Sequence, residues 1–186
     1  MPLAFLTGTT IALRALERAD AAAILPLVND QRVIQHLLIN RPTSIAAEEA
    51  FIEAVSRSET DLVFGICDRA TGALIGVTGL HRIDHKNRHA MFGIFIGDAR
   101  WRGKGRGTEA TAMIAGYAFD TLNLNRVWLH VYEDNTRAIR AYQKVGFRKE
   151  GLLRQDSYRR GRYWNTVVMG LLRKERKTAR RRRSRA

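Results

Sequence analysis

The chain has 186 residues and 45% of them are hydrophobic, which is enough for one folded domain with a sizeable core. It has no uncharged apolar run of about 18 residues and no basic leader before an apolar stretch, so we expect neither a membrane span nor a signal peptide, and a cytoplasmic protein. Its single cysteine, Cys67, excludes an internal disulfide and a cysteine-rich metal site.

The net charge of +14 is unevenly distributed, because residues 173–186 hold nine of the 32 basic residues and one acidic residue. A run such as ARRRRSRA repels itself and buries nothing. We therefore expect a disordered basic tail over residues 176–186, behind a single domain over residues 1–175. The tail is either simply solvated or contacts RNA, ribosomes or another polyanion. The rest of the chain is only moderately basic, which argues against a dedicated nucleic-acid binder.

The first third of the chain predicts one strand followed by helices. Residues 10–16 alternate as a strand does, and residues 17–30 follow as a helix that Pro26 shortens or kinks. Residues 31–38 form a second short helix. Ser44 is well placed to cap a third helix over residues 45–58.

The remaining segments predict a mixed α/β domain. Three strand-like runs joined by turns indicate an antiparallel meander over residues 61–97. The segments that follow are a helix over 108–122, a buried strand over 125–132, a helix over 136–145 with Asn135 as N-cap and Gly146 as terminator, and a hairpin of 147–161 and 162–172.

The stretch WRGKGRGTEA, residues 101–110, places three glycines at alternate positions before a helix. A helix start exposes unpaired backbone N–H groups and a positive dipole end, which together favour phosphate. Glycine lets an anion approach the backbone and tolerates positive φ. The alternative to a phosphate-binding loop is a flexible basic turn that binds no ligand. The spacing matches neither a Walker motif nor G-x-G-x-x-G, and it follows an antiparallel meander, so a dinucleotide-binding fold is not expected.

Two motifs resemble those of the GNAT superfamily of acyl-CoA-dependent N-acyltransferases. Residues 102–107 are similar to its R/Q-x-x-G-x-G/A signature. Residues 135–142, followed by Gly146 and Phe147, are similar to its N-x-x-A-x-x-x-Y…GF segment, at the expected distance. The flanking runs LNLNRVWLHV and GFRKEGLLR are typical of the branch that holds ribosomal-protein N-terminal acetyltransferases and spermidine acetyltransferases. The resemblance spans about residues 10 to 175.

The resemblance implies a fold and a cofactor. The fold is α/β, with a mixed, mostly antiparallel sheet, splayed central strands and helices on both faces. The cofactor is acetyl-CoA as acetyl donor, and its thioester lies between the splayed strands. Its pyrophosphate is expected on the backbone amides of Arg102, Gly103, Lys104, Gly105, Arg106 and Gly107, with Thr108 in the first helical turn. Its pantetheine arm is expected to pair like an added strand with Ile94, Phe95 and Ile96.

The implied chemistry is direct attack of a free amine on the thioester. It needs a polarised carbonyl, which a strand N–H can supply, and an acid that protonates the departing thiolate. The resemblance makes Tyr142 that acid, although it could also simply pack one face of its helix. Asn135 caps its helix in either case, and the resemblance adds contact with the pantetheine arm.

The sequence differs from the family pattern at the position of the general base, the group that removes a proton from the amine. Many relatives carry a carboxylate at the position of Met91, and methionine cannot take a proton. His130 and Glu133 are candidates, and a water chain is an alternative to any side chain. His81, His85 and His89 gather near one turn, but a polar turn does not fix a metal site, so no metal is expected.

The favoured acceptor is the N-terminal amine of a protein, especially a ribosomal one. The runner-up is a small cationic amine such as a polyamine or an aminoglycoside. Acidic residues for it exist at Glu48, Glu49, Glu59 and Asp61, where a solvated role is the simpler interpretation. A non-catalytic CoA- or RNA-binding module is the alternative from another class. The aromatic hairpin around Trp164 would suit a homodimer.

Overall fold

The computed structural model describes residues 3–35, 37, 41–97 and 99–176. Within them one sheet of eight strands has the order β1-β2-β3-β4-β5-β6-β8-β7. The strands are β1 (Leu6–Thr7), β2 (Ile11–Ala15), β3 (Leu62–Asp68), β4 (Leu74–Asp84), β5 (His89–Ile96), β6 (Arg126–Tyr132), β7 (Arg148–Arg159) and β8 (Arg162–Leu172). The helices are α1 (Ala21–Val28), α2 (Gln31–Ile34), α3 (Ile45–Ser56), α4 (Arg106–Asp120) and α5 (Thr136–Val145), with 3-10 turns η1 (Arg18–Asp20) and η2 (Ala99–Trp101).

Most predicted elements are present with small shifts at their ends. The antiparallel meander is confirmed as β3, β4 and β5. The Ser44 hydroxyl accepts a hydrogen bond from the Ala47 N–H at 3.2 Å and starts α3 as expected. The two-residue strand β1 was not predicted, and α4 begins two residues earlier than expected, at Arg106.

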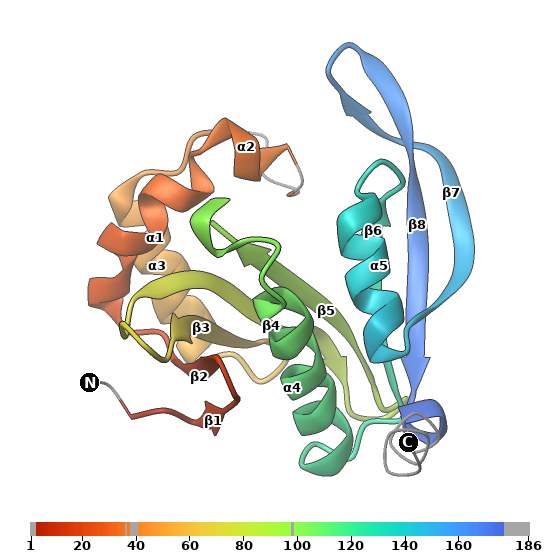
Figure 1. Cartoon of the computed structure of the whole chain (residues 1–186), viewed down its shortest axis with the longest axis horizontal. Helices are drawn as coiled ribbons and strands as arrows, with labels where there is room; N and C mark the ends of the chain where they lie inside the picture. Colours follow the sequence, from red (N-terminus) through yellow and green to blue (C-terminus); the bar gives the residue numbers. More distant parts are fainter. Residues whose placement is uncertain (1–2, 36, 38–40, 98, 177–186) are drawn as a thin grey trace.

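The centre of the sheet opens between β5 and β6, which run parallel while the other neighbouring pairs of described strands are antiparallel. These two strands pair only from His89↔Arg126 to Met91↔Trp128. Beyond that point they diverge, which makes the V between the green and teal strands in Figure 1. Their separated lengths keep backbone groups that sheet pairing would otherwise consume.

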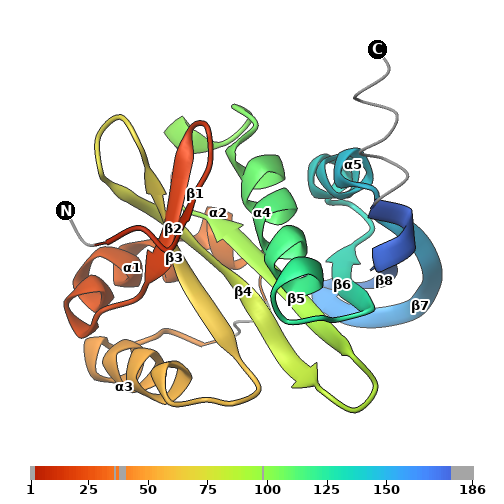
Figure 2. The same cartoon turned by 90° about the horizontal axis from the view of Figure 1, so that it is seen from below.

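Helices cover both faces of the sheet. Figure 2 shows α1 and α3 on one side of β3–β5 and α4 on the other. The larger core joins α4 to the sheet through buried residues such as Ala110, Ile114 and Phe119. A smaller core packs Ile24 of α1 and Ile52 of α3 against the opposite face. None of the described helices is long and apolar enough to cross a membrane.

The described chain ends beside α4. Residues 173–176 form a helical turn, and the Arg176 guanidinium lies 2.7 Å from the Asp120 carboxylate. Arg176 therefore packs on the domain, although the basic tail was expected to begin there. The rest of that predicted tail, residues 177–186, lies outside the described residues.

Candidate active site

The glycine loop has the conformation that its sequence suggested. Gly103 and Gly105 have φ of +76° and +81°, a region that other residues rarely occupy, and Gly105 is the N-cap of α4. A Cβ added at either glycine would meet nothing within 4 Å. Because α4 begins at Arg106, the N–H groups of its first turn have no carbonyl acceptor within the helix. The loop thus presents an accessible backbone and a positive helix end together.

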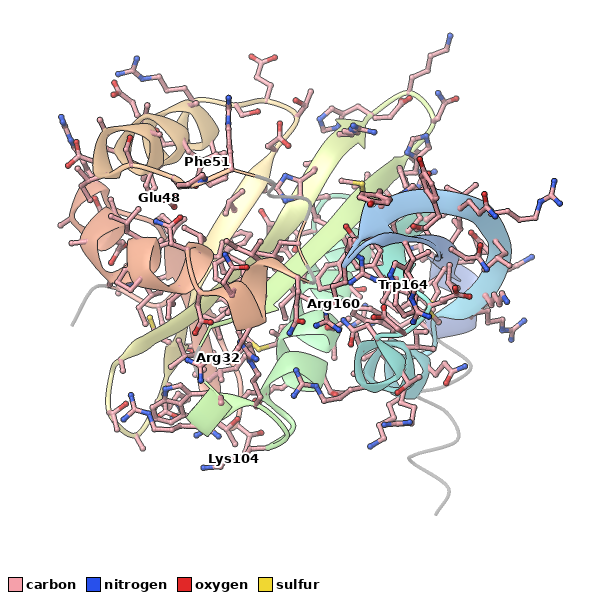
Figure 3. All side chains as sticks on the ribbon, turned by 90° about the horizontal axis from the view of Figure 1, so that it is seen from above. Arg32, Glu48, Phe51, Lys104, Arg160 and Trp164 are labelled. Carbon is pink, nitrogen blue, oxygen red and sulfur yellow. The ribbon has the colours of Figure 1, made fainter. Side chains whose placement is uncertain are left out.

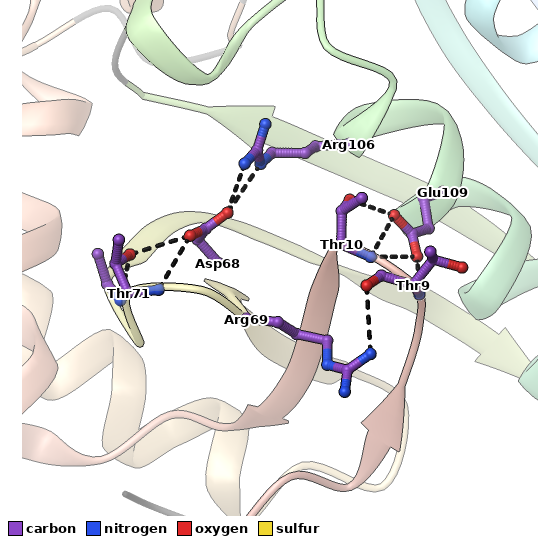
Figure 4. A network of polar contacts seen from close by, with 8 residues as sticks. Thr9, Thr10, Asp68, Arg69, Thr71, Arg106 and Glu109 are labelled. Atoms are coloured by element: carbon purple, nitrogen blue, oxygen red, sulfur yellow. Dashed lines mark hydrogen bonds and ion pairs between the residues drawn. The ribbon is translucent and has the colours of Figure 1, made fainter.

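A polar network holds this end of α4 on the neighbouring strands (Figure 4). The Arg106 Nε donates to the Asp68 carboxylate at 3.1 Å, and that carboxylate also accepts from the Thr71 N–H at 3.1 Å. The Arg106 hydrogen bonds, and then those of Thr71, hold the pKa of the Asp68 carboxyl below its usual range against the effect of burial. One turn further, the Glu109 carboxylate accepts from the Thr10 N–H at 3.0 Å.

The three basic side chains of the loop therefore differ in role. The Arg106 guanidinium is bound to Asp68 and lies 4.8 Å from the Trp101 ring centroid. Arg102 donates to the carbonyls of Ile96 at 2.9 Å and Gly97 at 2.5 Å, which fixes the end of β5. Lys104 is exposed at the outer edge of the loop, as Figure 3 shows. The side chains of Arg102 and Arg106 thus hold the loop itself.

A cavity of about 860 Å³ runs from the glycine loop through the gap between β5 and β6. It brings together most of the predicted site. The predicted residues that line it are Ile94, Phe95, Ile96, Arg102, Gly103, Gly105, Gly107, Thr108, Asn135 and Tyr142. Lys104 and Arg106 lie outside this lining, although both belong to the same loop.

The cavity has two halves because alternate residues of β5 face opposite sides of the sheet. Phe92, Ile94 and Ile96 pack with the larger core under α4, so the loop and α5 complete what we call the α4 half. Phe95 packs with the smaller core, and Met91 and Gly93 share its face. Arg32, Glu48, Phe51 and His81 also line the cavity, on what we call the α3 half. Figure 3 shows Glu48 and Phe51 on α3, across from Arg160 and Trp164 of the hairpin.

Tyr142 enters the cavity from α5. Its ring lies edge-on to Phe92, with centroids 6.1 Å apart, and 6.0 Å from the Phe147 ring. Burial among these groups raises the pKa of the Tyr142 phenol to about 12. The hydroxyl therefore keeps its proton at neutral pH and remains able to donate it.

Asn135 has the predicted capping role. Its side-chain oxygen accepts a hydrogen bond from the Ala138 N–H at 3.2 Å, and Gly146 ends the helix with φ of +116°. Since Asn135 also lines the cavity, the predicted contact with the pantetheine arm is sterically open.

The candidate bases are placed differently from one another. His130 lines the cavity, and its ring lies 5.2 Å from the Trp128 ring. The Glu133 carboxylate accepts from the backbone N–H and the side-chain amide of Asn165, at 3.1 and 3.0 Å, and is not part of the lining. Met91 lines the cavity and offers no group that can accept a proton.

The position of His81 in the cavity was not predicted from the sequence. The sequence groups His81 with two other histidines, but His85 is exposed and His89 lies 3.9 Å from Asp84. His81 instead lines the cavity, with its Nδ1 2.9 Å from the Asp61 carboxylate. Among the described residues no group of three metal-ligating side chains is found.

The burial of Glu48 was also not predicted, because its place in the sequence suggests a solvated helix face. Its neighbour Glu49 is indeed paired with Arg18 at 2.7 Å, and Glu59 is exposed. Glu48 is only 6% exposed and lines the α3 half of the cavity. Burial raises the pKa of its carboxyl above the usual value. Within the described residues the structure shows no hydrogen bond or ion pair to this carboxylate.

Comparison with known proteins identifies the family. A family model described as an acetyltransferase (GNAT) domain matches residues 10–148. The chain therefore belongs to the GNAT acetyltransferases, and it is an acetyl-CoA-dependent N-acetyltransferase with acetyl-CoA as its acetyl donor. The predicted fold and enzyme class are confirmed, which removes the ground for a non-catalytic module.

Named relatives divide between two acceptors. Spermidine N(1)-acetyltransferase of Vibrio cholerae is 30% identical over 165 residues, covering 89% of this chain and 94% of the relative. The protein named "Putative ribosomal N-acetyltransferase YdaF" of Bacillus subtilis is 31% identical over 172 residues, covering 89% of this chain and 92% of the relative. A crystal structure of the Vibrio cholerae spermidine N-acetyltransferase with CoA and spermine superposes with a TM-score of 0.84, at 28% identity, over 91% of this chain and 99% of that one.

Proposed function

We propose that the acceptor is a small cationic amine of the polyamine class, with Glu48 as a binding site for one of its ammonium groups. The observation that carries this proposal is the buried Glu48 carboxylate in the α3 half of the cavity. The spermidine acetyltransferases among the relatives point in the same direction. The sequence alone favoured a protein N-terminus, and these two findings shift the preference.

The physical argument concerns the cost of a buried charge. A partly desolvated carboxylate is stabilised when an opposite charge lies within hydrogen-bonding distance. Burial has raised the pKa of the Glu48 carboxyl, and the described residues supply no such partner for it. A polyamine reacts through one amine and keeps at least one further ammonium. That ammonium would supply the partner, while Phe51 beside it offers an apolar wall for the methylene chain.

The α4 half suits the acetyl donor in the same scheme. The pyrophosphate would lie on the amides of the glycine loop and the start of α4, and the pantetheine arm along Ile94, Phe95 and Ile96 of β5. The thioester would then reach the gap between β5 and β6, with the Tyr142 hydroxyl as the acid for the departing thiolate. The acceptor amine would approach the same carbon from the α3 half.

The test is release of free CoA thiol from acetyl-CoA across a panel of acceptors. The panel contains spermidine, spermine, a monoamine of similar length, aminoglycosides, and peptides that begin with Ser, Ala or Met. We expect spermidine or spermine to give the highest kcat/KM. A peptide that exceeded both by a wide margin would overturn the proposal.

A pair of variants on one helix makes the test specific. Glu48→Gln should raise the KM for spermidine about tenfold, because a charge-assisted contact is lost, and should leave the monoamine unaffected. Glu53→Gln is the matched control, since that carboxylate is 53% exposed and paired with Arg57 on the surface. An equal effect of both variants would remove Glu48 from the acceptor site.

The second candidate is the N-terminal amine of a protein, which the similarity to YdaF favours. Its single ammonium is consumed in the reaction, so it leaves none for Glu48. Peptide turnover that Glu48→Gln leaves unchanged would therefore favour this candidate over a polyamine.

A further inference from the structure

The acceptor ammonium must lose a proton to a base before its nitrogen can attack, and Met91, which lines the α3 half of the cavity, cannot accept one. We propose that His81, oriented by Asp61, is this base. The inference rests on the N-acetyltransferase activity and not on which amine is the acceptor.

The Asp61 carboxylate fixes the tautomer of His81. Its Oδ1 lies 2.9 Å from His81 Nδ1, and its other oxygen accepts from the hydroxyls of Ser58 and Thr60, both at 3.1 Å. Burial opposes the charge on Asp61, but these hydrogen bonds prevail and lower the pKa of its carboxyl. An ionised carboxylate only accepts, so Nδ1 carries the proton and Nε2 keeps a free lone pair.

The backbone places that lone pair where β5 and β6 begin to separate. His81 is opposite Met91 in the β4–β5 ladder, and Met91↔Trp128 is the last pair before the separation. A Cβ added to Gly93 would lie 3.3 Å from His81 Nε2, so the imidazole lies over that glycine. The register of the β4–β5 ladder shifts directly after His81, and such bulges often redirect a side chain near a site.

The surroundings suit a proton acceptor. The charged or titratable groups that line the cavity near its α3 half are Arg32 of α2, Glu48 of α3, His130 and Tyr132 of β6 and Asp156 of β7, in addition to Asp61 behind the ring. The His81 side chain is 28% exposed, which gives its proton a route to solvent. His130 is the rival base, and no hydrogen bond to a carboxylate orients it within the described residues.

The proposed reaction moves three protons in sequence. An acceptor R–NH3+ gives one proton to His81 Nε2, and the resulting free amine attacks the thioester carbon to form a tetrahedral intermediate. As the C–S bond breaks, the Tyr142 hydroxyl protonates the sulfur. The second proton on nitrogen then restores the phenol, and His81 returns its proton to water. The products are an amide, CoA thiol and one proton.

The test compares His81→Gln, Asp61→Asn and the double variant, using whichever acceptor of the panel the unmodified enzyme turns over fastest. We expect His81→Gln to lower kcat/KM about 100-fold at pH 7, in the range usual for a lost general base, with unchanged affinity for acetyl-CoA by calorimetry. The deficit should shrink as the pH rises toward the acceptor's own pKa, because free amine is then supplied by solution. His85→Gln, in the exposed turn, is the matched control and should be neutral.

Non-additivity is the second criterion. If Asp61 acts only through His81, adding Asp61→Asn to His81→Gln should cause little further loss. The proposal is overturned if His81→Gln retains its kcat/KM, if its loss is the same at every pH, or if the loss appears as weaker acetyl-CoA binding. A pH-dependent loss in His130→Gln with an active His81→Gln would transfer the role to His130.

Discussion

Burial controls the ionisation state of the Tyr142 hydroxyl. Its pKa is raised to about 12, so the phenol is protonated at neutral pH and begins to lose its proton only as the pH approaches that value. Tyr142→Phe should lower kcat about 100-fold and leave the affinity for acetyl-CoA unchanged, since only a proton donor is removed. Stopped-flow measurement of thiol release checks this, and no alkaline decline due to Tyr142 is expected up to about pH 10. A kcat within twofold of the unmodified enzyme would contradict the assigned role.

A second prediction at the residue scale concerns Gly105, which has φ of +81° in open space. Gly105→Ala should cost about 1 kcal/mol of stability from the left-handed backbone and should also weaken acetyl-CoA binding strongly. Gly161 offers a matched control, because it has φ of +76°, equally open surroundings and a place in the β7–β8 turn. Gly161→Ala should show a similar change in Tm with normal acetyl-CoA affinity. Equal affinities of the two variants for acetyl-CoA would show that the glycine loop does not bind the cofactor.

At the scale of elements, the network in Figure 4 joins the start of α4 to the β1–β2 turn and to the end of β3, where the β3–β4 turn begins. Asp68 is 1% exposed and binds Arg106. Asp68→Asn should therefore let the glycine loop move and raise the KM for acetyl-CoA about tenfold with little change in kcat. Glu53→Gln, on the far helix, serves again as control. A fall in kcat with unchanged KM would mean that the network does not act through the cofactor.

The Asp68–Arg106 ion pair makes the stability of the folded protein depend on pH. The pKa of Asp68 is lowered in the folded protein, so its contribution to stability is complete above the unfolded value of about 4 and is lost as the pH falls through the lower folded value. Thermal unfolding of Asp68→Asn should accordingly differ from that of the unmodified protein at pH 7, and the difference should narrow at pH 3.

Elements also show why the sequence predicted some features and not others. Helix caps and the glycine loop depend on residues only a few positions apart, so the roles of Ser44, Asn135 and Gly105 in the local backbone could be predicted from the sequence. The strand β1 has two residues and carries no periodicity. Asp61 and His81 are twenty residues apart and meet only through the β3–β4 pairing. The burial of Glu48 depends on how α3 packs against the sheet. The sequence around a glutamate in a helix does not indicate this packing.

For the whole molecule, the separation of β5 and β6 makes one cavity accessible from both faces of the sheet. The α4 half depends on α4, α5 and the glycine loop, and the α3 half depends on α2 and α3. Two substrates can therefore meet without passing each other. This arrangement favours a ternary complex over a covalent acetyl-enzyme, and the single cysteine, Cys67, is buried in β3 and absent from the lining.

The described residues that line the cavity extend no further than Thr166, whereas residues 177–186 carry six basic residues. Deleting 177–186 keeps the Arg176–Asp120 ion pair and should leave kcat/KM for a small amine within twofold. The same deletion should lower the affinity for RNA and flatten its salt dependence, because phosphate contacts by cations dominate such binding. A variant of the whole chain with these six residues changed to glutamine distinguishes the effect of lost charge from the effect of a shorter chain. Lost turnover of spermidine in either variant would show that the basic segment belongs to catalysis, while RNA affinity unchanged by both would show that it does not bind RNA.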